Sequence, residues 1–265
     1  MGWRGDWTGG EPVRLNKFLA QSGVCSRREA DGLIAQGLVS VDGVPVLDAG
    51  RKVAPGQTVA LADAAKAALG GLTIMLHKPT GYVSGQPEPG KIPAVRLLTA
   101  AGQVGSGEVP ASNLSLPPIG RLDEDSRGLL LMSTDGVVAK AVIGPQSELD
   151  KEYRVRVRGE VTPAIVAQLR HGLELDGRAL KPAGVFDNGK GRLKFILMEG
   201  RNRQIRRMCE LVDLRVVDLQ RTRIGPLKLD SLEEGRWRHL TAEERADLIS
   251  ASTDNSALAE RRSGE

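Results

Sequence analysis

The sequence predicts an α+β protein made of two domains, a small one followed by a larger one. Its 265 residues exceed the roughly 150 residues of an average domain, so two domains are expected. Apolar residues account for 40% of the chain and charged residues for 26%, a mixture typical of folded rather than disordered proteins. Helical spacing and strand-like alternation occur on both sides of residues 63–71, an Ala-, Lys- and Gly-rich stretch that we interpret as a linker.

The predicted small domain covers residues 13–62. Leu15, Phe18 and Leu19 follow helical spacing, and the capping box from Ser26 to Glu29 is expected to start a second helix. The expected strands are 39–41, 44–46 and 58–61. Residues 1–12 show neither periodicity nor the apolar core of a signal peptide, so we expect a flexible arm there, with Trp3 and Trp7 in it.

The predicted large domain covers residues 72–250. Its expected strands are 72–79, 129–132, 153–159 and 193–200, and its expected helices are 137–143, 163–171 and 203–212. A second capping box, Thr241 to Glu244, is expected to open a last helix. Residues 99–117 lack periodicity and are expected to form a mobile surface loop, and residues 251–265 a disordered tail.

Several classes of protein are disfavoured. No apolar run approaches the roughly 18 residues of a membrane span. Cys25 and Cys209 lie in apolar helical patterns, so reduced core thiols in a reducing cytosol are expected. The three histidines are far apart and no cysteine pair has ligand spacing, so we expect no metal site. Phosphate-binding glycine motifs are missing as well.

Positive charge gathers in one segment of the chain. Between Arg201 and Arg223 there are seven arginines, no lysine and three acids, a local charge equal to the +4 of the whole protein. Arginines without lysines are typical of bidentate phosphate or carboxylate recognition, but a solvated helix face with internal ion pairs would look the same. Charge alone leaves the two interpretations even.

One carboxylate stands out in the stretch from Pro118 to Gly136. Asp123 follows Gly120 and Arg121 and precedes a strongly apolar strand, so it is expected to be rigid and partly desolvated. Burial alone favours the neutral acid, whereas a nearby arginine would keep the carboxylate ionised. An ionised, positioned carboxylate can act as a nucleophile or a general base, although aspartates with purely structural roles in turns are common.

The stretch "RLNKFLAQSGVCSRREADGLIAQGLVSVDG", residues 14–43, resembles an S4 RNA-binding domain in both residue type and spacing. In that family two helices present basic residues to RNA phosphates. The resemblance therefore implies RNA contacts for four residues, namely Arg14, Lys17, Arg27 and Arg28.

Four further segments resemble the pseudouridine synthases that modify small- and large-subunit ribosomal RNA. They are "LHKPTGYVS", "GRLDEDSRGLLLMSTDG", "DKEYRVRV" and "EGRNRQIRRMCE", in the family's order and after an S4 domain. The form of the last segment is most similar to the large-subunit synthase F branch. His77, Tyr82 and the loop 99–117 depart from the family's pattern. The implied fold is a catalytic domain with a mixed, largely antiparallel sheet flanked by helices.

The resemblance also implies roles for single residues. Asp123 would be the nucleophile and Arg206 its ion-pair partner, while Tyr153 would stack on the target uracil. The resemblance also implies substrate contacts for Arg121 and Ile205. Three more residues are expected to bind the substrate, namely Lys78, Arg203 and Arg207. In the predicted helix, Ile205 belongs to an apolar stripe with Arg206 at its flank, and Arg203 and Arg207 lie on the other face, suited to phosphates.

The expected reaction is the isomerisation of uridine to pseudouridine in ribosomal RNA, 23S in this branch, by a cytoplasmic monomer without cofactor, metal, membrane or obligate protein partner. The alternatives are the same chemistry on 16S ribosomal RNA or on tRNA, and an RNA-binding protein with a decayed catalytic domain. The residues also leave open whether Asp123 adds to the ring, attacks the sugar or removes a proton from C2′.

Overall fold

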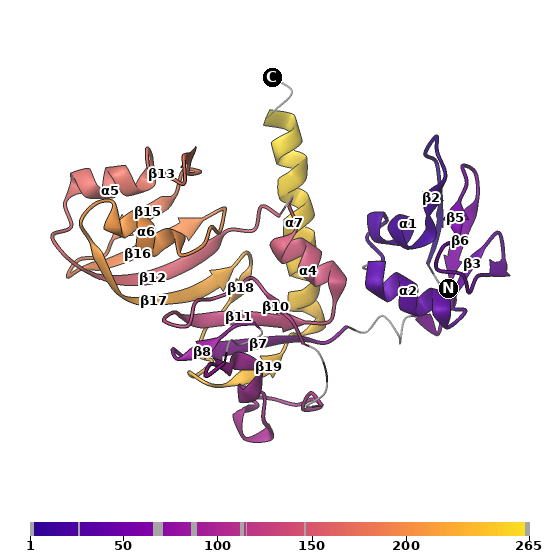
Figure 1. The fold of residues 1–265 in the computed structure, drawn as a ribbon, viewed down its shortest axis with the longest axis horizontal. Coiled ribbons are helices and arrows are strands. Elements are labelled where there is room, and N and C mark those ends of the chain that lie inside the picture. The colour runs from indigo at the N-terminus through magenta and orange to yellow at the C-terminus, as the bar shows by residue number, and fades with distance from the viewer. Residues whose placement is uncertain are drawn as a thin grey trace. The chain divides into compact units, whose positions relative to one another are not determined.

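The computed structural model describes residues 3–25, 27–65, 71–85, 89–111, 114, 116–145 and 147–262. The chain divides into two compact units: one contains residues 1–73 and 133–140, and the other contains residues 74–132 and 141–265. Ser26 of the first predicted capping box and most of the predicted linker lie outside the described residues. Both units appear in Figure 1.

The first unit combines two short helices with antiparallel strands. The helices are α1 (Leu15–Gln21) and α2 (Arg27–Ala35). One sheet has the order β1-β6-β3-β4, and β2 pairs with β5 separately. The strands are β1 (Arg4–Asp6), β2 (Val13–Arg14), β3 (Val39–Val41), β4 (Val44–Pro45), β5 (Lys52–Val53) and β6 (Thr58–Leu61). Apolar residues between Val13 and Ala65, including Leu15, Leu33 and Val59, form its core.

The predicted flexible arm is wrong for part of residues 1–12. Strand β1 pairs antiparallel with β6, and the rings of Trp3 and Trp7 lie 6.0 and 5.8 Å from that of Phe18. Gly5 and Asp6 have low strand propensity, so local sequence gives no strand signal. The hydrogen bonds to β6 and the contacts of the two tryptophans with Phe18 therefore stabilise this strand.

The second unit is built on a nine-stranded sheet with the central order β15-β16-β12-β17-β11-β7-β19. Strands β11 and β17 run parallel, whereas β15–β16, β12–β16, β12–β17 and β7–β19 are antiparallel pairs. The mixed, largely antiparallel sheet is therefore confirmed. Its strands are β7 (Thr73–Lys78), β10 (Pro118–Ile119), β11 (Arg127–Ser133), β12 (Lys151–Arg158), β15 (Gly184–Asp187), β16 (Arg192–Leu197), β17 (Arg215–Ile224), β18 (Leu227–Lys228) and β19 (Trp237–His239). Two small pairs stand apart, β8 (Tyr82–Val83) with β9 (Ile92–Pro93) and β13 (Glu174–Leu175) with β14 (Arg178–Ala179).

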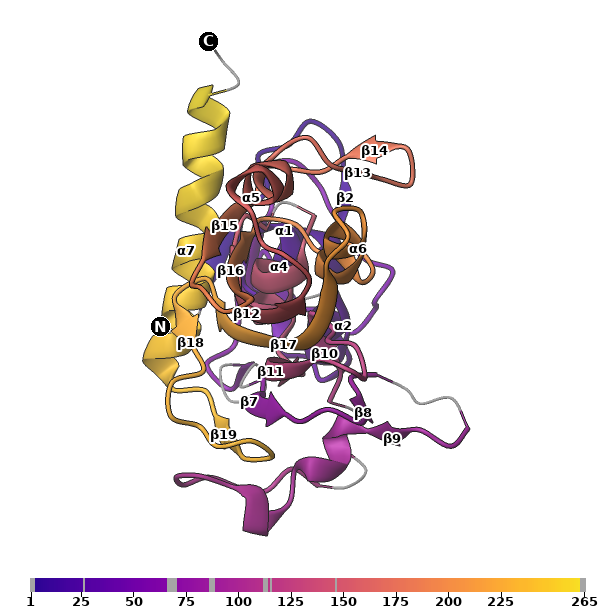
Figure 2. The same cartoon turned by 90° about the vertical axis from the view of Figure 1, so that its left-hand side faces the viewer.

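Two helices cover one face of this sheet. They are α5 (Pro163–Arg170) and α6 (Gln204–Glu210), and both lie on the same side of β12 and β17 in Figures 1 and 2. Their apolar residues pack on alternate residues of the strands, such as Val155, Leu193 and Phe195, to form the core of this part. The remaining helices are α4 (Gly136–Ile143) and α7 (Ala242–Arg262).

The C-terminal helix starts as predicted but continues further. The amide of Glu244 donates to Thr241 Oγ1 at 3.1 Å, and the amide of Thr241 donates to Glu244 Oε2 at 3.0 Å, which confirms the capping box. Helix α7 then extends to Arg262, so the predicted disordered tail is wrong for residues 251–262. Residues 257–262 are Ala, Leu, Glu and Arg, which are strong helix formers. They form no apolar stripe, so hydrophobic periodicity does not indicate a helix there.

Part of the predicted mobile loop is held by a buried tryptophan. Short 3-10 helices occupy Ala94–Leu97 and Ala100–Gly102. The indole nitrogen of Trp237 donates to the carbonyl of Thr99 at 2.9 Å, and the amide of Val104 donates to the carbonyl of Trp237 at 2.8 Å. The expectation of a mobile loop is therefore wrong for residues 99–104. These contacts are made by residues far apart in sequence, and periodicity does not detect such contacts.

Candidate active site

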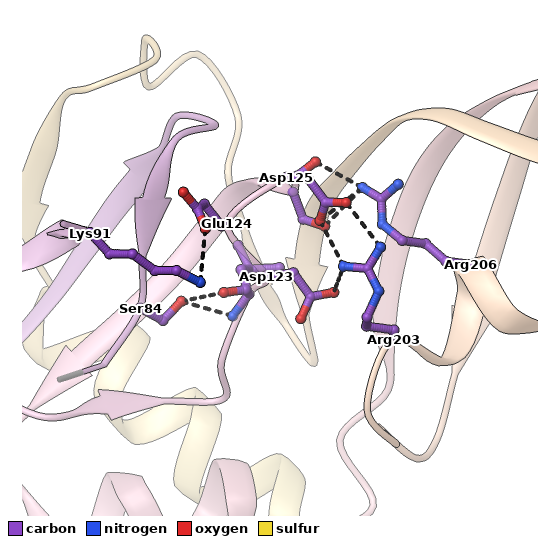
Figure 3. Close-up of polar contacts among 9 residues, drawn as sticks. Ser84, Lys91, Asp123, Glu124, Asp125, Arg203 and Arg206 are labelled. Atoms are coloured by element: carbon purple, nitrogen blue, oxygen red, sulfur yellow. Dashed lines mark hydrogen bonds and ion pairs between the residues drawn. The ribbon is translucent and has the colours of Figure 1, made fainter. Parts of the chain in front are cut away.

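The segment that carries Asp123 is the turn between β10 and β11, and it is held at several points. The amide of Ser126 donates to the carbonyl of Asp123 at 3.1 Å. Ser84 Oγ donates to the carbonyl of Leu122 at 2.7 Å and accepts from the amide of the same residue at 2.9 Å. Figure 3 shows the two contacts of Ser84 beside the carboxylate of Asp123. The turn is therefore anchored directly before and after the candidate catalytic residue.

A buried arginine fastens this turn to the sheet. Arg221 on β17 is only 3% exposed, and its guanidinium donates to the carbonyls of Leu129 at 2.8 Å and Gly120 at 2.9 Å. Gly128 allows β11 to approach the backbone of Arg221 on β17, because a Cβ at residue 128 would lie 2.3 Å from the carbonyl oxygen of Arg221. We had not singled out Arg221 from the sequence. Its only signal was its place in the segment "RTRI".

The side chain of Asp123 is 35% exposed and faces Arg203, not the predicted Arg206. Asp123 Oδ2 lies 3.7 Å from Arg203 Nη1, which is ion-pair distance but too long for a hydrogen bond. Arg206 Nη2 instead donates to the carbonyl of Asp125 at 2.8 Å and lies 3.3 Å from both Ser126 Oγ and Asp125 Oδ1. The expected pair of Arg206 with Asp123 is therefore a wrong prediction (Figure 3).

The physical reason is the start of helix α6. Its first residue is Gln204 rather than the predicted Arg203, and Arg203 has the left-handed backbone conformation, with φ of +48°. Arg203 therefore does not share the helix face of Arg207, and its guanidinium meets the carboxylates of the turn. Arg206, 8% exposed, braces the backbone of that turn from the helix.

The two aspartates of the turn have different electrostatic environments. Burial would raise the pKa of Asp125, but hydrogen bonds from Arg203 at 3.0 and 3.1 Å and the charge of Arg206 outweigh burial and lower it. The same hydrogen bonds raise the pKa of Arg203. Both oxygens of Asp125 are thus occupied. By contrast, no described residue donates a hydrogen bond to the carboxylate of Asp123, which leaves its oxygens available for chemistry.

Asp123 lies in a cleft of about 720 Å³ that belongs wholly to the second unit. The cleft brings together six of the predicted site residues, namely Arg121, Asp123, Tyr153, Arg203, Ile205 and Arg206. Tyr153 comes from β12 and Ile205 from α6, so an aromatic ring and an aliphatic side chain share a cleft with the carboxylate.

Two predicted substrate-binding residues do not line the cleft. Lys78 is fully buried, its Nζ donates to the carbonyl of Pro79 at 2.7 Å, and burial lowers its pKa to about 8. Arg207 binds both oxygens of Asp176, at 2.6 and 2.9 Å. Lys78 was placed by its motif, which does not reveal burial, and Asp176 is too distant in sequence for the pairing with Arg207 to be predicted.

The cleft also contains cations that we had not predicted, Lys151 and Arg201. The ammonium group of Lys151 has no hydrogen-bond partner among the described residues. Burial and the charge of Arg221 lower the pKa of Lys151 to about 8, although the charge of Asp150 acts in the opposite direction. Its signal in the sequence was its position two residues before Tyr153 in the segment "DKEYRVRV".

In the first unit, Arg14, Lys17 and Arg27 are exposed, as RNA contacts must be; the side chain of Arg28 lies outside the described ones. Lys52 is the cross-strand partner of Arg14 and adds a cation that the sequence motif does not indicate. Cys25 and Cys209 are free and buried, and burial raises the pKa of each thiol to about 12.

The described part of the chain has no group of three His, Cys, Asp or Glu residues placed to hold a metal ion. None of its helices combines the length and the apolar character needed to cross a membrane.

Comparison with known proteins agrees with this geometry. A family described as RNA pseudouridylate synthase matches residues 73–211, and one described as the S4 domain matches residues 13–59. The first of these covers more than half of the chain. The chain belongs to the RNA pseudouridine synthase family. It is therefore an enzyme that acts on RNA, with an S4 domain before its catalytic domain.

Relatives of this synthase extend over nearly the whole chain. Dual-specificity RNA pseudouridine synthase RluF of Escherichia coli (strain K12) is 33% identical over 248 residues, which are 92% of this chain and 81% of that protein. An uncharacterized RNA pseudouridine synthase of Aquifex aeolicus is 34% identical over 89% of this chain and 96% of its own. A crystal structure of a pseudouridylate synthase matches 89% of this chain with a TM-score of 0.61 and 26% identity.

Proposed function

We propose that this synthase isomerises uridine in ribosomal RNA, that of the large subunit, with Asp123 as its catalytic carboxylate. The observation that carries the proposal is the unequal environment of the two aspartates. Asp125 is held on both oxygens by Arg203, whereas Asp123 lines the cleft and its carboxylate accepts no hydrogen bond from the residues that the structure describes. The similarity of the sequence motifs to ribosomal RNA synthases supports the choice of substrate.

In the proposed reaction, the target uridine leaves its helix to reach the cleft, at a cost of a few kcal/mol. Stacking on an aromatic ring is worth about 1–3 kcal/mol per base, and Tyr153 offers that ring while Ile205 packs from α6. The bond between N1 of uracil and C1′ breaks, the base turns, and C5 bonds to C1′. The proton of C5 is lost and N1 gains one, so the composition of the nucleotide is unchanged.

Asp123 can assist bond breaking by three routes. It can add to the uracil ring, attack C1′ of the sugar or remove the proton from C2′. Each route needs a carboxylate oxygen that is free to react, and Arg203 Nη1, at 3.7 Å from Asp123 Oδ2, is too distant to occupy that oxygen with a hydrogen bond. Arg121 and Lys151 line the same cleft and suit the phosphates on either side of the flipped nucleotide, whereas the guanidinium of Arg201 is bound to three backbone carbonyls and to Glu199.

The proposal includes a monomeric enzyme that works in the cytoplasm without an obligate protein partner. Two free, buried cysteines are compatible with a reducing compartment. Sedimentation of the purified protein would test the monomer, and fractionation of cells would test the compartment.

The test of the catalytic carboxylate is Asp123→Asn, with Glu124→Gln as the matched control. Glu124 is the next residue and is exposed, and its carboxylate pairs with Lys91 at 3.3 Å. We expect Asp123→Asn to abolish pseudouridine formation in transcribed 23S ribosomal RNA while RNA binding persists, and Glu124→Gln to keep turnover. Turnover of Asp123→Asn within about tenfold of the unmodified enzyme would refute the assignment.

The choice of RNA is tested by mapping pseudouridines in cells with and without the gene. Loss of sites in 23S ribosomal RNA would support the proposal. Loss only in 16S ribosomal RNA or in tRNA would keep the chemistry but overturn the substrate. No loss in any RNA would favour a binding role without catalysis.

A further inference from the structure

The sheet of the catalytic unit has a second charged surface, on the face turned away from α5 and α6. Along β12, Val155 and Val157 point to the core, so Arg154 and Arg156 point to the other face, and both are exposed. In Figure 1 no helix lies beyond this face of β12 and β17 among the described elements.

The strand register gathers four cations on this face. Arg154 lies opposite Lys194 and Arg156 lies opposite Arg192, in the antiparallel pair of β12 with β16. Neighbouring strands are about 4.8 Å apart, and alternate residues of a strand are about 6.8 Å apart. The Cα atoms of the four residues therefore lie at the corners of a small rectangle. We call these four residues the cationic face.

The acids near the cationic face have other partners. Asp218 lies opposite Arg156 in the pairing of β12 with β17 and its charge interacts with Arg156, but its carboxylate is bound by Arg127 at 2.9 Å. Glu152 lies 3.8 Å from Arg223. Among the described residues no carboxylate is within ion-pair distance of the four cations. Like charges opposite each other destabilise a sheet. The cluster therefore gives the fold no advantage of its own, and an external anion would relieve the repulsion.

An exposed aromatic ring borders the cations. Phe186 on β15 lies opposite Lys194 in the register and is 42% exposed, and Lys194 Nζ lies 4.5 Å from the centre of its ring. Aromatic rings beside cations are typical of surfaces that bind single-stranded nucleic acid. The centres of protein–protein interfaces are depleted in charged residues, so this composition favours RNA over a protein partner.

We propose that the cationic face binds the phosphodiester backbone of the RNA substrate, at a segment separate from the target uridine. Tyr153 and Arg154 are adjacent in β12, but the first lines the cleft and the second lies on the opposite face. Contacts on this face therefore hold the RNA without touching the reacting nucleotide. Their loss should weaken RNA binding and leave the chemical step unchanged.

The test is the double variant Arg154→Gln/Lys194→Gln. Its matched control is Arg96→Gln/Lys228→Gln, which removes one exposed arginine and one exposed lysine elsewhere in the same unit. Equilibrium binding to transcribed 23S ribosomal RNA is measured over a range of KCl concentrations, without turnover. Each lost phosphate contact removes about 0.7–0.9 from the slope of log K against log salt, so we expect the slope of the double variant to fall by about 1 to 2.

In the control pair the slope should stay near that of the unmodified enzyme, and kcat at saturating RNA should be unchanged in both variants. A third variant, Arg154→Lys/Lys194→Arg, keeps both charges and should keep the slope. The proposal is overturned if Arg154→Gln/Lys194→Gln matches the control pair, or if the charge-keeping variant loses as much of the slope as the neutral one. Because binding is measured directly, the result does not depend on which uridine is modified.

Discussion

Asp123 and Asp125 lie two residues apart in one turn, but their side chains have different neighbours. Asp125 is surrounded by guanidinium groups and fixes the position of the turn, whereas the oxygens of Asp123 accept no hydrogen bond within the described part of the chain. The motif in the sequence pointed to Asp123, the carboxylate that we propose as catalytic. It did not identify which arginine faces Asp123, because that depends on where α6 begins and on the backbone of Arg203.

The role of Arg206 can be separated from that of its neighbour on α6. We expect Arg206→Met to lower kcat by about 10²-fold with little change in KM, because the turn loses its brace and a displacement of about 1 Å can cost that much. Arg207→Met should keep kcat, since Arg207 pairs with Asp176 outside the cleft. Steady-state kinetics on 23S ribosomal RNA measures both, and equal values of kcat would contradict the bracing role.

Lys151 should make RNA binding dependent on pH. Burial and Arg221 lower its pKa to about 8, so its charge is present below that pH and is lost as the pH rises through it. Lys151→Gln should therefore bind RNA more weakly than the parent near pH 7, and the difference should shrink towards about pH 9. Binding is measured in an Asp123→Asn background to exclude turnover. A ratio of affinities that is constant over this range would show that Lys151 does not contact phosphate.

Among the elements, those with strong local signals were predicted well. The capping box of α7 and the alternating strands β12 and β16 follow directly from their sequences. Strand β1 could not be predicted, since Gly5 and Asp6 have no strand preference and the pairing with β6 supplies the order. The anchoring of residues 99–104 likewise depends on Trp237, more than 130 residues later in the chain.

The junction of β11 with β17 is expected to be intolerant of any side chain at Gly128. In Gly128→Ala the new Cβ would meet the backbone of Arg221 at 2.3 Å, and φ at this residue is +111°. We expect a loss of at least about 2 kcal/mol in the free energy of unfolding. Gly200→Ala is the control, because a Cβ there has nothing within 4 Å, and it should stay within about 0.5 kcal/mol. Denaturant unfolding of both variants decides the point, and equal stabilities would contradict it.

At the scale of the whole molecule, each unit has a hydrophobic core of its own. The core of the first unit is built from residues 13–65, and α5 and α6 with their strands form the other. The division into an S4 domain and a catalytic domain was predictable, because motifs of known order lie on both sides of residues 63–71. The boundaries 13–62 and 72–250 remain our proposal for the domain limits.

Deletion of residues 1–62 should leave a folded catalytic domain that binds RNA more weakly and with a flatter salt dependence. The exposed cations Arg14, Lys17 and Arg27 would be removed, and each phosphate contact contributes about 0.7–0.9 to the slope. Circular dichroism checks the fold, and salt titration of 23S ribosomal RNA binding checks the slope. An unchanged slope would place the docking of RNA elsewhere, with the segment Arg201–Arg223 as the next candidate.

Strand β12 directs Tyr153 towards the cleft and Arg154 away from it. This alternation constrains the number of residues in the strand more than their identity. Adding or removing one residue between Lys151 and Tyr153 would turn the later side chains of the strand to the opposite face, unless the irregularity already present at this position of the pairing with β17 absorbs the change. The arginines would then enter the apolar core beneath α5 and α6, and Val155 and Val157 would face water. The strand can accept substitutions in β12 one at a time, but a single insertion or deletion would exchange the buried and the exposed side chains of β12 in one step.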